Sequence, residues 1–165
     1  MSKRGRQYIG LFVAILAYYV IHEGAHFIYA LILGTFKKIN IIGLGVQVDI
    51  YRENMSDMQL AVFCLVGSIT TLLVGYVLVL FIDKIGSLSS KEVKACMYYV
   101  TMVMLFMDPL YLSLLCSFFG GGDMNGIIFI CPEFVMRIIY GVIFLVNIIV
   151  YLKVVLPKYK AAFRN

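Results

Sequence analysis

The sequence predicts an all-α polytopic membrane protein with about four transmembrane helices and a short β-hairpin between the first two. Of its 165 residues, 62% are hydrophobic and 14% are charged, whereas a soluble domain has about 45 to 50% apolar and about 25% charged residues. The apolar residues also gather in four long stretches. At this length the chain is expected to form a single integral membrane domain, residues 1–165.

Each apolar stretch is close to or above the roughly 20 residues that a helix needs to cross the hydrocarbon core of a bilayer. The stretches cover residues 7–33, 58–82, 93–119 and 134–156. Basic residues cluster before the first, between the second and third, and after the fourth, which predicts cytoplasmic N- and C-termini under the positive-inside rule. Three basic residues between the first two stretches oppose this orientation: Lys37, Lys38 and Arg52.

The net charge of +5 comes mainly from basic residues at the ends of the apolar stretches, where they are expected to contact lipid head groups. No basic patch is interleaved with exposed aromatic residues, so nucleic-acid binding is not expected. The four cysteines are widely spaced and form no C-x-x-C pair. We therefore interpret them as small apolar packing residues.

Residues 39–51, between the first two stretches, have the pattern of a hairpin. From Val46 to Tyr51 apolar and polar residues alternate strictly, and Gly43 and Gly45 can supply a turn before them. The segment is either a simple connection or an edge strand that pairs with an extended polypeptide through main-chain hydrogen bonds.

The second apolar stretch contains regularly spaced small residues, and the third contains a proline and is followed by glycines. Gly67, Thr71 and Gly75 follow one another at intervals of four residues, which predicts close packing against a neighbouring helix. Pro109 removes a backbone donor and should kink the third helix. The glycines at 120–122 allow a sharp turn that can aim Asp123 back toward the bundle.

The most specific motif is His22-Glu23-Gly24-Ala25-His26, inside the first apolar stretch. On an α-helix the step from His22 to His26 is a turn of about 400° and a rise of about 6 Å, so both imidazoles leave the same face. One metal ion can then be held by both, with Glu23 beside it as a general base, which is the zincin pattern. The alternative is a polar cluster or proton relay between helices.

A catalytic zinc site normally has three protein ligands and one open position. Because both histidines are already used, the third ligand must be an acidic residue or a cysteine. Asp123 follows the third stretch at the membrane face near which the first helix ends, and the flexible glycines before it favour a ligand loop. Asp108, within the third stretch, is the rival candidate.

With these residues the chain resembles a minimal member of the site-2 protease family of intramembrane zinc metalloproteases. The resemblance rests on residues 22–26, the hairpin-like segment, the glycine-bearing second helix and the glycine-flanked Asp123. It implies that His22, His26 and Asp123 bind Zn²⁺ and that Glu23 is the general base.

The resemblance implies hydrolysis of a peptide bond in or near the transmembrane segment of a membrane protein or peptide substrate. The predicted partners are thus this substrate and the lipid bilayer. The alternative function is non-catalytic: a degenerate protease scaffold that binds a partner helix, or a transporter subunit that uses His and Glu as a proton relay. The sequence makes no prediction about the oligomeric state.

Overall fold

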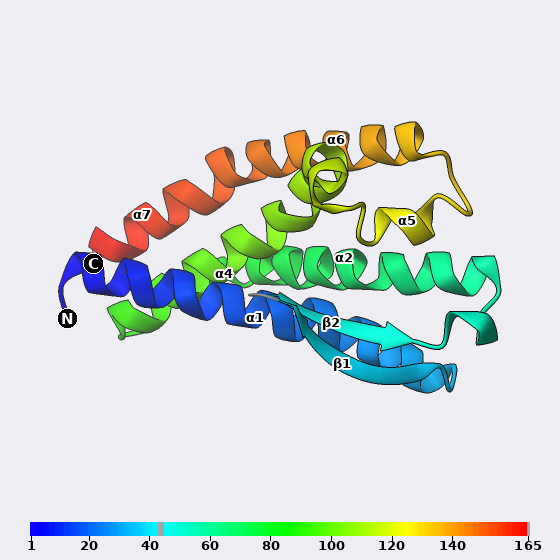
Figure 1. The fold of residues 1–165 in the computed structure, drawn as a ribbon. Helices are drawn as coiled ribbons and strands as arrows, with labels where there is room; N and C mark the ends of the chain where they lie inside the picture. Colours follow the sequence, from blue (N-terminus) through cyan, green and yellow to red (C-terminus); the bar gives the residue numbers. More distant parts are fainter. Residues whose placement is uncertain (43–44, 165) are drawn as a thin grey trace.

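The computed structural model describes residues 1–42 and 45–164. In this part of the chain, four helical segments are long and apolar enough to cross a membrane, and the molecule is a multi-pass membrane protein, as predicted. They form an elongated bundle with the hairpin on one side, and both termini lie at the same end (Figure 1). The long helices are α1 (Lys3–Ile32), α2 (Asp57–Leu80), α4 (Lys91–Leu110) and α6 (Glu133–Val150).

Shorter elements connect or extend these helices. They are β1 (Phe36–Ile42), β2 (Gly45–Ile50), a 3₁₀ turn (Arg52–Asn54), α3 (Ile82–Gly86), a π-helical turn (Tyr111–Leu115), a second 3₁₀ turn (Cys116–Phe119), α5 (Met124–Ile127), a second π-helical turn (Tyr151–Val155) and α7 (Leu156–Arg164).

Serine side chains set the starts of three long helices. Ser2, Ser56 and Ser90 each accept a hydrogen bond from the backbone N–H three residues later, which satisfies one of the donors left over at a helix N-terminus. At the start of α2, the side-chain oxygen of Gln59 accepts a hydrogen bond from the backbone N–H of Ser56, which completes a capping box. Polar caps therefore begin each of these helices just before its apolar run.

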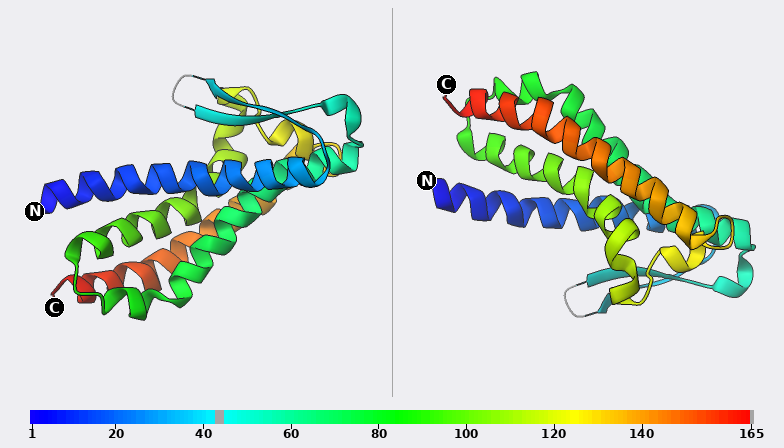
Figure 2. Two further views of the ribbon diagram at one scale, coloured as in Figure 1. Left: turned by 90° about the horizontal axis from the view of Figure 1, so that it is seen from below. Right: turned by 90° about the horizontal axis from the view of Figure 1, so that it is seen from above.

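The predicted hairpin is confirmed, with β1 and β2 paired antiparallel and Ile39 opposite Val48. Gly43, expected in the turn, lies outside the described residues. Figure 2 shows that the hairpin lies beside α1. The side chain of Val48 is buried while that of Gln47 is exposed, so the alternation predicted from the sequence separates a buried face from an exposed one.

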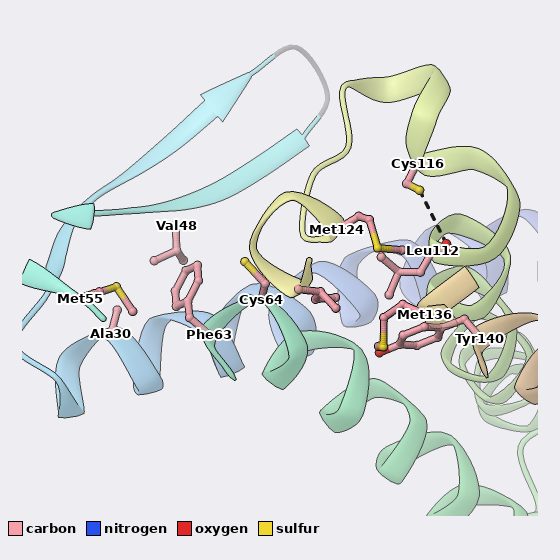
Figure 3. Close-up of a cluster of buried hydrophobic side chains, with 11 residues drawn as sticks. Ala30, Val48, Met55, Phe63, Cys64, Leu112, Cys116, Met124, Met136 and Tyr140 are labelled. Atoms are coloured by element: carbon pink, nitrogen blue, oxygen red, sulfur yellow. Dashed lines mark hydrogen bonds between the residues drawn. The ribbon is translucent and has the colours of Figure 1, made fainter. Parts of the chain in front are cut away.

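The largest buried apolar cluster lies around the end of α2 that is nearest to the hairpin. Val48 of β2, Phe63 and Cys64 of α2, and Met124 of α5 meet in it (Figure 3). Because the same cluster packs both the hairpin and α5, these two elements are held against one end of the bundle. All four cysteines are free, and the two most buried, Cys64 and Cys116, belong to this cluster, as expected for packing residues.

The third span bends where the sequence predicts it. The α-helix ends at Leu110, immediately after Pro109, and the π-helical turn that follows runs in a different direction (Figure 2). Pro109 cannot donate to the carbonyl of Leu105 four residues earlier. The side-chain amide of Asn147 donates to that carbonyl instead, at 2.5 Å, so α6 compensates for the bond that the proline removes.

The glycine run after this span turns the chain back toward the bundle. Gly120, Gly121 and Gly122 have φ angles of 79°, 88° and 49°, in the left-handed region that residues with a Cβ rarely occupy. The three residues lead directly into α5, at whose N-terminal end Asp123 lies. The turn expected from the sequence is therefore present, and it requires glycine.

Candidate metal centre

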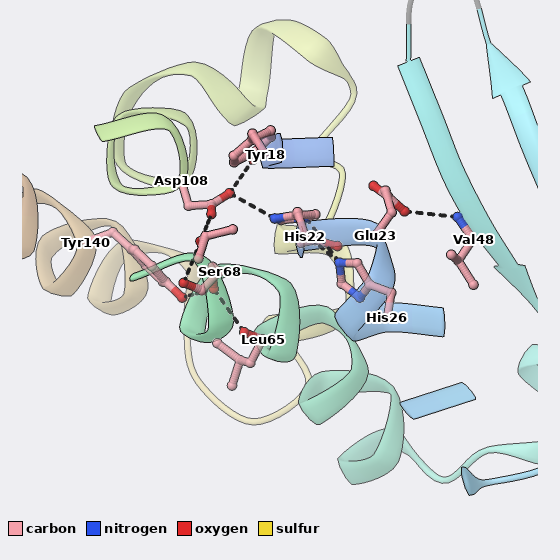
Figure 4. Close-up of polar contacts among 11 residues, drawn as sticks. Tyr18, His22, Glu23, His26, Val48, Leu65, Ser68, Asp108 and Tyr140 are labelled. Carbon is pink, nitrogen blue, oxygen red and sulfur yellow. Dashed lines mark hydrogen bonds and ion pairs between the residues drawn. The ribbon is translucent and has the colours of Figure 1, made fainter. Parts of the chain in front are cut away.

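The two histidines of the motif share one face of α1, as their spacing predicts. Both are buried, at 8% and 3% exposure, and their Nε2 atoms lie 3.1 Å apart. The ring of Phe63 from α2 packs against His26, with the ring centroids 4.7 Å apart. Figure 4 shows both imidazoles between α1 and α2. The rings are thus fixed by packing, with both Nε2 atoms directed to one point.

Gly67 on α2 makes room for these rings. A Cβ added at Gly67 would lie 2.5 Å from Nε2 of His26 and 2.8 Å from Nε2 of His22, which is closer than such atoms approach. The sequence predicted Gly67 only as a packing residue. Helix packing is confirmed at Gly75, where an added Cβ would lie 3.0 Å from Leu105, but Gly67 faces the histidine nitrogens and so belongs to the site.

Asp123 completes the cluster from the distant loop. Its Oδ2 lies 3.2 Å from Nε2 of His22 and 3.6 Å from Nε2 of His26. Burial alone would raise the pKa of Asp123, but its contacts with the two histidines hold that pKa below its usual range. The side chain is therefore an anion whose oxygen faces two ring nitrogens.

The three atoms are close to the spacing of ligands around a small tetrahedral metal ion. Bonds of about 2.0 to 2.2 Å at tetrahedral angles place ligand atoms about 3.3 to 3.6 Å from one another. The separations here are 3.1, 3.2 and 3.6 Å. Among the described residues, His22, His26 and Asp123 form a group that could hold a metal ion. Three protein ligands would leave one tetrahedral position open.

Asp108, the rival third ligand, lies on the opposite side of His22. Its Oδ1 is 3.3 Å from Nδ1 of His22 and accepts a 2.6 Å hydrogen bond from the hydroxyl of Tyr18, while Thr71 donates to its Oδ2 (Figure 4). A carboxylate facing Nδ1 favours the tautomer that carries its proton there, which leaves the Nε2 lone pair for a metal. Asp108 thus faces Nδ1 of the imidazole, and Asp123 faces its Nε2.

Glu23 lies beside the cluster, between α1 and the hairpin. Its Oε2 accepts a 3.1 Å hydrogen bond from the backbone N–H of Val48 in β2 (Figure 4). Glu23, the three residues of the metal group and residues 45–50 of β2 all line one cavity of about 820 Å³. A carboxylate, a candidate metal group and a strand edge therefore share one space large enough for a peptide segment.

Three contributors to this site were not identified as such from the sequence: Tyr18, Gly67 and Thr71. Tyr18 precedes His22 by one helical turn, so spacing places it on the face of α1 that carries a predicted ligand. Thr71 follows Gly67 by one turn on α2, but neither residue was predicted to be part of the site. What spacing does not give is the rotation of α2 about its axis, which decides whether the stripe faces the histidines or lipid.

Comparison of the chain with protein-family models, with curated proteins and with solved structures finds no match. The assignment of function therefore depends on the geometry of the site.

Proposed function

We propose that the protein is an intramembrane zinc metalloprotease, which hydrolyses a peptide bond in or near the transmembrane segment of a membrane protein or peptide substrate. The observation that carries the proposal is the single cavity in which His22, His26 and Asp123 converge at tetrahedral spacing with Glu23 beside them. This is the combination of ligands and base that metal-dependent peptide hydrolysis requires.

The donor set favours zinc over other metals. Two imidazole nitrogens, one carboxylate oxygen and an open fourth position are typical of catalytic zinc sites. When bound here, zinc would supply Lewis acidity toward the scissile carbonyl and the attacking water. The chain's own residues position the ligands. Asp108 favours one tautomer of His22, Phe63 packs against the ring of His26, and Gly67 leaves space for both rings.

Glu23 is the proposed general base. It takes a proton from the attacking water, whose oxygen forms the new bond to the carbonyl carbon, and delivers a proton to the leaving amine as the C–N bond breaks. Its hydrogen bond from Val48 N–H holds the carboxylate beside the metal group. The strand thereby positions the base as well as lining the cavity.

The edge of β2 is the proposed binding site for the substrate backbone. A transmembrane helix hides its carbonyls in its own hydrogen bonds, so the cleaved segment must be extended, and an extended segment can pair with a strand edge. The N–H of Val48 points away from β1 and toward Glu23. Since successive amides of a strand alternate between its two edges, the amides of Val46 and Ile50 face the same way.

The proposed orientation in the membrane uses the positive-inside rule. Both termini lie at one end of the bundle (Figure 1), and basic residues occupy the first turns of α1 and the length of α7. We therefore place this end in the cytoplasm, under the positive-inside rule.

The decisive experiment compares Glu23→Gln and His22→Ala with the wild type. Each purified protein is assayed for zinc content, and each is co-expressed with single-span membrane proteins to detect a truncated product. We expect Glu23→Gln to keep about one zinc per chain while cleavage falls at least about 100-fold, the range for loss of a general base. His22→Ala should lose both. Full cleavage by Glu23→Gln would overturn the proposal.

The second candidate function is proton transfer without hydrolysis. The buried chain of contacts from Tyr18 through Asp108 to His22 is what a proton relay would use. Zinc content separates the two candidates, because a relay needs no metal at Nε2. Purified wild-type protein without zinc, and unable to bind added zinc, would favour the relay.

A further inference from the structure

A second cavity, of about 620 Å³, is lined by residues from the first turns of α1 and from α7, at the end of the bundle where both termini lie. The starts of α1 and α4 and the last turns of α7 form its walls. Five basic residues line it: Lys3, Arg6, Lys91, Lys160 and Arg164.

The charge in this cavity is unbalanced. None of the described residues that line it is acidic. Within residues 1–42 and 45–164, the acidic side chain that contacts a lining residue is Glu92, whose carboxylate is 3.9 Å from Arg6 and whose side chain is 46% exposed. Five like charges around one space repel one another, and an anion in that space would relieve the repulsion.

Two helix N-termini add to the positive potential. Lys3 and Lys91 are the first residues of α1 and α4, whose backbone N–H groups carry partial positive charge at this end. Such partial charges favour an anion, and helix N-termini are suited to bind phosphate groups. The side chains and the backbone thus favour the same type of ligand.

The inner wall of the cavity is aromatic. Tyr98, Tyr99, Tyr159 and Phe163 line it, and the rings of Tyr98 and Tyr159 pack edge to face with centroids 5.1 Å apart. Tyrosines at the level where helices enter the membrane pack against the glycerol and upper acyl region of lipids. A basic rim around an aromatic wall matches a phosphate group attached to an apolar tail.

We propose that this cavity binds the phosphate-bearing head group of an anionic phospholipid. It lies at the ends of membrane-spanning helices, which is where head groups are found, and basic pockets between such helices are suited to anionic lipids. The proposal is independent of the protease function, since it involves none of the residues of the metal centre.

The test measures the rise in thermal unfolding temperature of the detergent-solubilised full chain on titration with phosphatidylglycerol, with phosphatidylcholine and with soluble glycerol phosphate. The variant Lys160→Gln/Arg164→Gln removes two charges from the cavity. The control, Lys84→Gln/Lys158→Gln, removes two charges outside the cavity at the same membrane face. Lys158 lies on the same helix as Lys160, and its partner is Asp83.

We expect phosphatidylglycerol to stabilise the wild type and the control equally, and the cavity variant to need roughly 30-fold more lipid for the same shift. Equal loss in the two double variants would mean that net charge alone attracts the lipid, and would overturn the site. An equal shift with phosphatidylcholine would overturn the requirement for an anionic lipid. An equal rise in unfolding temperature with glycerol phosphate would show that the cavity binds soluble phosphates, and would overturn the proposal that its ligand is a lipid.

Discussion

Of the groups of buried polar side chains among the described residues, two differ in how their hydrogen bonds are arranged. One surrounds His22 near the hairpin, and the other surrounds Asn147 on α6. Both hold fully buried residues in a part of the chain that spans the membrane, where unpaired polar groups are unfavourable. The comparison distinguishes polar residues that stabilise the fold from polar residues that are arranged to bind a ligand.

At Asn147 both polar atoms of the side-chain amide have a partner in the protein. The hydroxyl of Tyr76 donates to Oδ1 of Asn147 at 2.5 Å, and Nδ2 of Asn147 donates to the carbonyl of Leu105 at 2.5 Å. That carbonyl is the one that Pro109 leaves without its helical partner. The group is closed on itself and needs nothing from outside.

At His22 the hydrogen bonds are incomplete. Asp108 accepts hydrogen bonds from Tyr18 and Thr71, and its Oδ1 lies 3.3 Å from Nδ1 of His22, which has no hydrogen-bond partner among the described residues. On the other side, two ring nitrogens and the carboxylate of Asp123 face one another at 3.1 to 3.6 Å and border an open cavity. A cation between these groups would be stabilised by the Asp123 carboxylate and by the electron pair of any ring nitrogen that carries no proton, which is why this group indicates a candidate metal site.

The largest effect should separate the two aspartates that contact His22. Asp123→Ala removes a proposed ligand and should lower zinc content to well below one per chain. Asp108→Asn keeps the shape of the side chain but loses the charge that orients the imidazole, and changes of this kind typically weaken metal affinity by about 10- to 100-fold. Competition with a zinc chelator measures both. Full zinc retention by Asp123→Ala with complete loss in Asp108→Asn would exchange their roles.

A smaller effect is expected from the space beside the histidines. Gly67→Ala places a methyl group within 2.5 to 2.8 Å of the two Nε2 atoms, so the rings must move, and we expect at least a tenfold loss of zinc affinity with little change in helix content by circular dichroism. Gly24→Ala is the matched control, because an added Cβ there has no atom within 4 Å. Equal affinities in the two variants would show that Gly67 serves packing alone.

The fold could be predicted from the sequence where the signal is local. The first span was expected at residues 7–33 and is observed at Lys3–Ile32, because its lipid-facing surface makes the hydropathy pattern continuous. The fourth was expected to end at residue 156, yet it continues as α7 to Arg164. That last part is polar on one side and packs against α3 and α4 through Tyr159, and such a helix leaves little hydropathy signal.

The candidate site, too, could be predicted only where the sequence signal is local. The facing of His22 and His26 follows from a separation of four residues on one helix, and the geometry agrees. The approach of Asp123 could be inferred from the number of spans and the glycines before it. The positions of Gly67 and Thr71 against the histidines and Asp108 depend on how α2 is rotated in the bundle, which no local pattern in the sequence records.

The smallest effect on the metal centre should come from the closed polar group. Asn147→Leu leaves the carbonyl of Leu105 and the hydroxyl of Tyr76 without their partners, which should lower the free energy of unfolding by about 1 kcal/mol, as for other hydrogen bonds between membrane helices. Tyr76→Phe removes only one of these bonds and should cost less. Denaturation of the detergent-solubilised proteins measures the stability, and zinc content should remain about one per chain in both. Loss of zinc in Asn147→Leu without loss of stability would contradict the distinction between the two polar groups. If the group at Asn147 serves only the fold, its loss can affect the metal centre only by destabilising the packing of the helices.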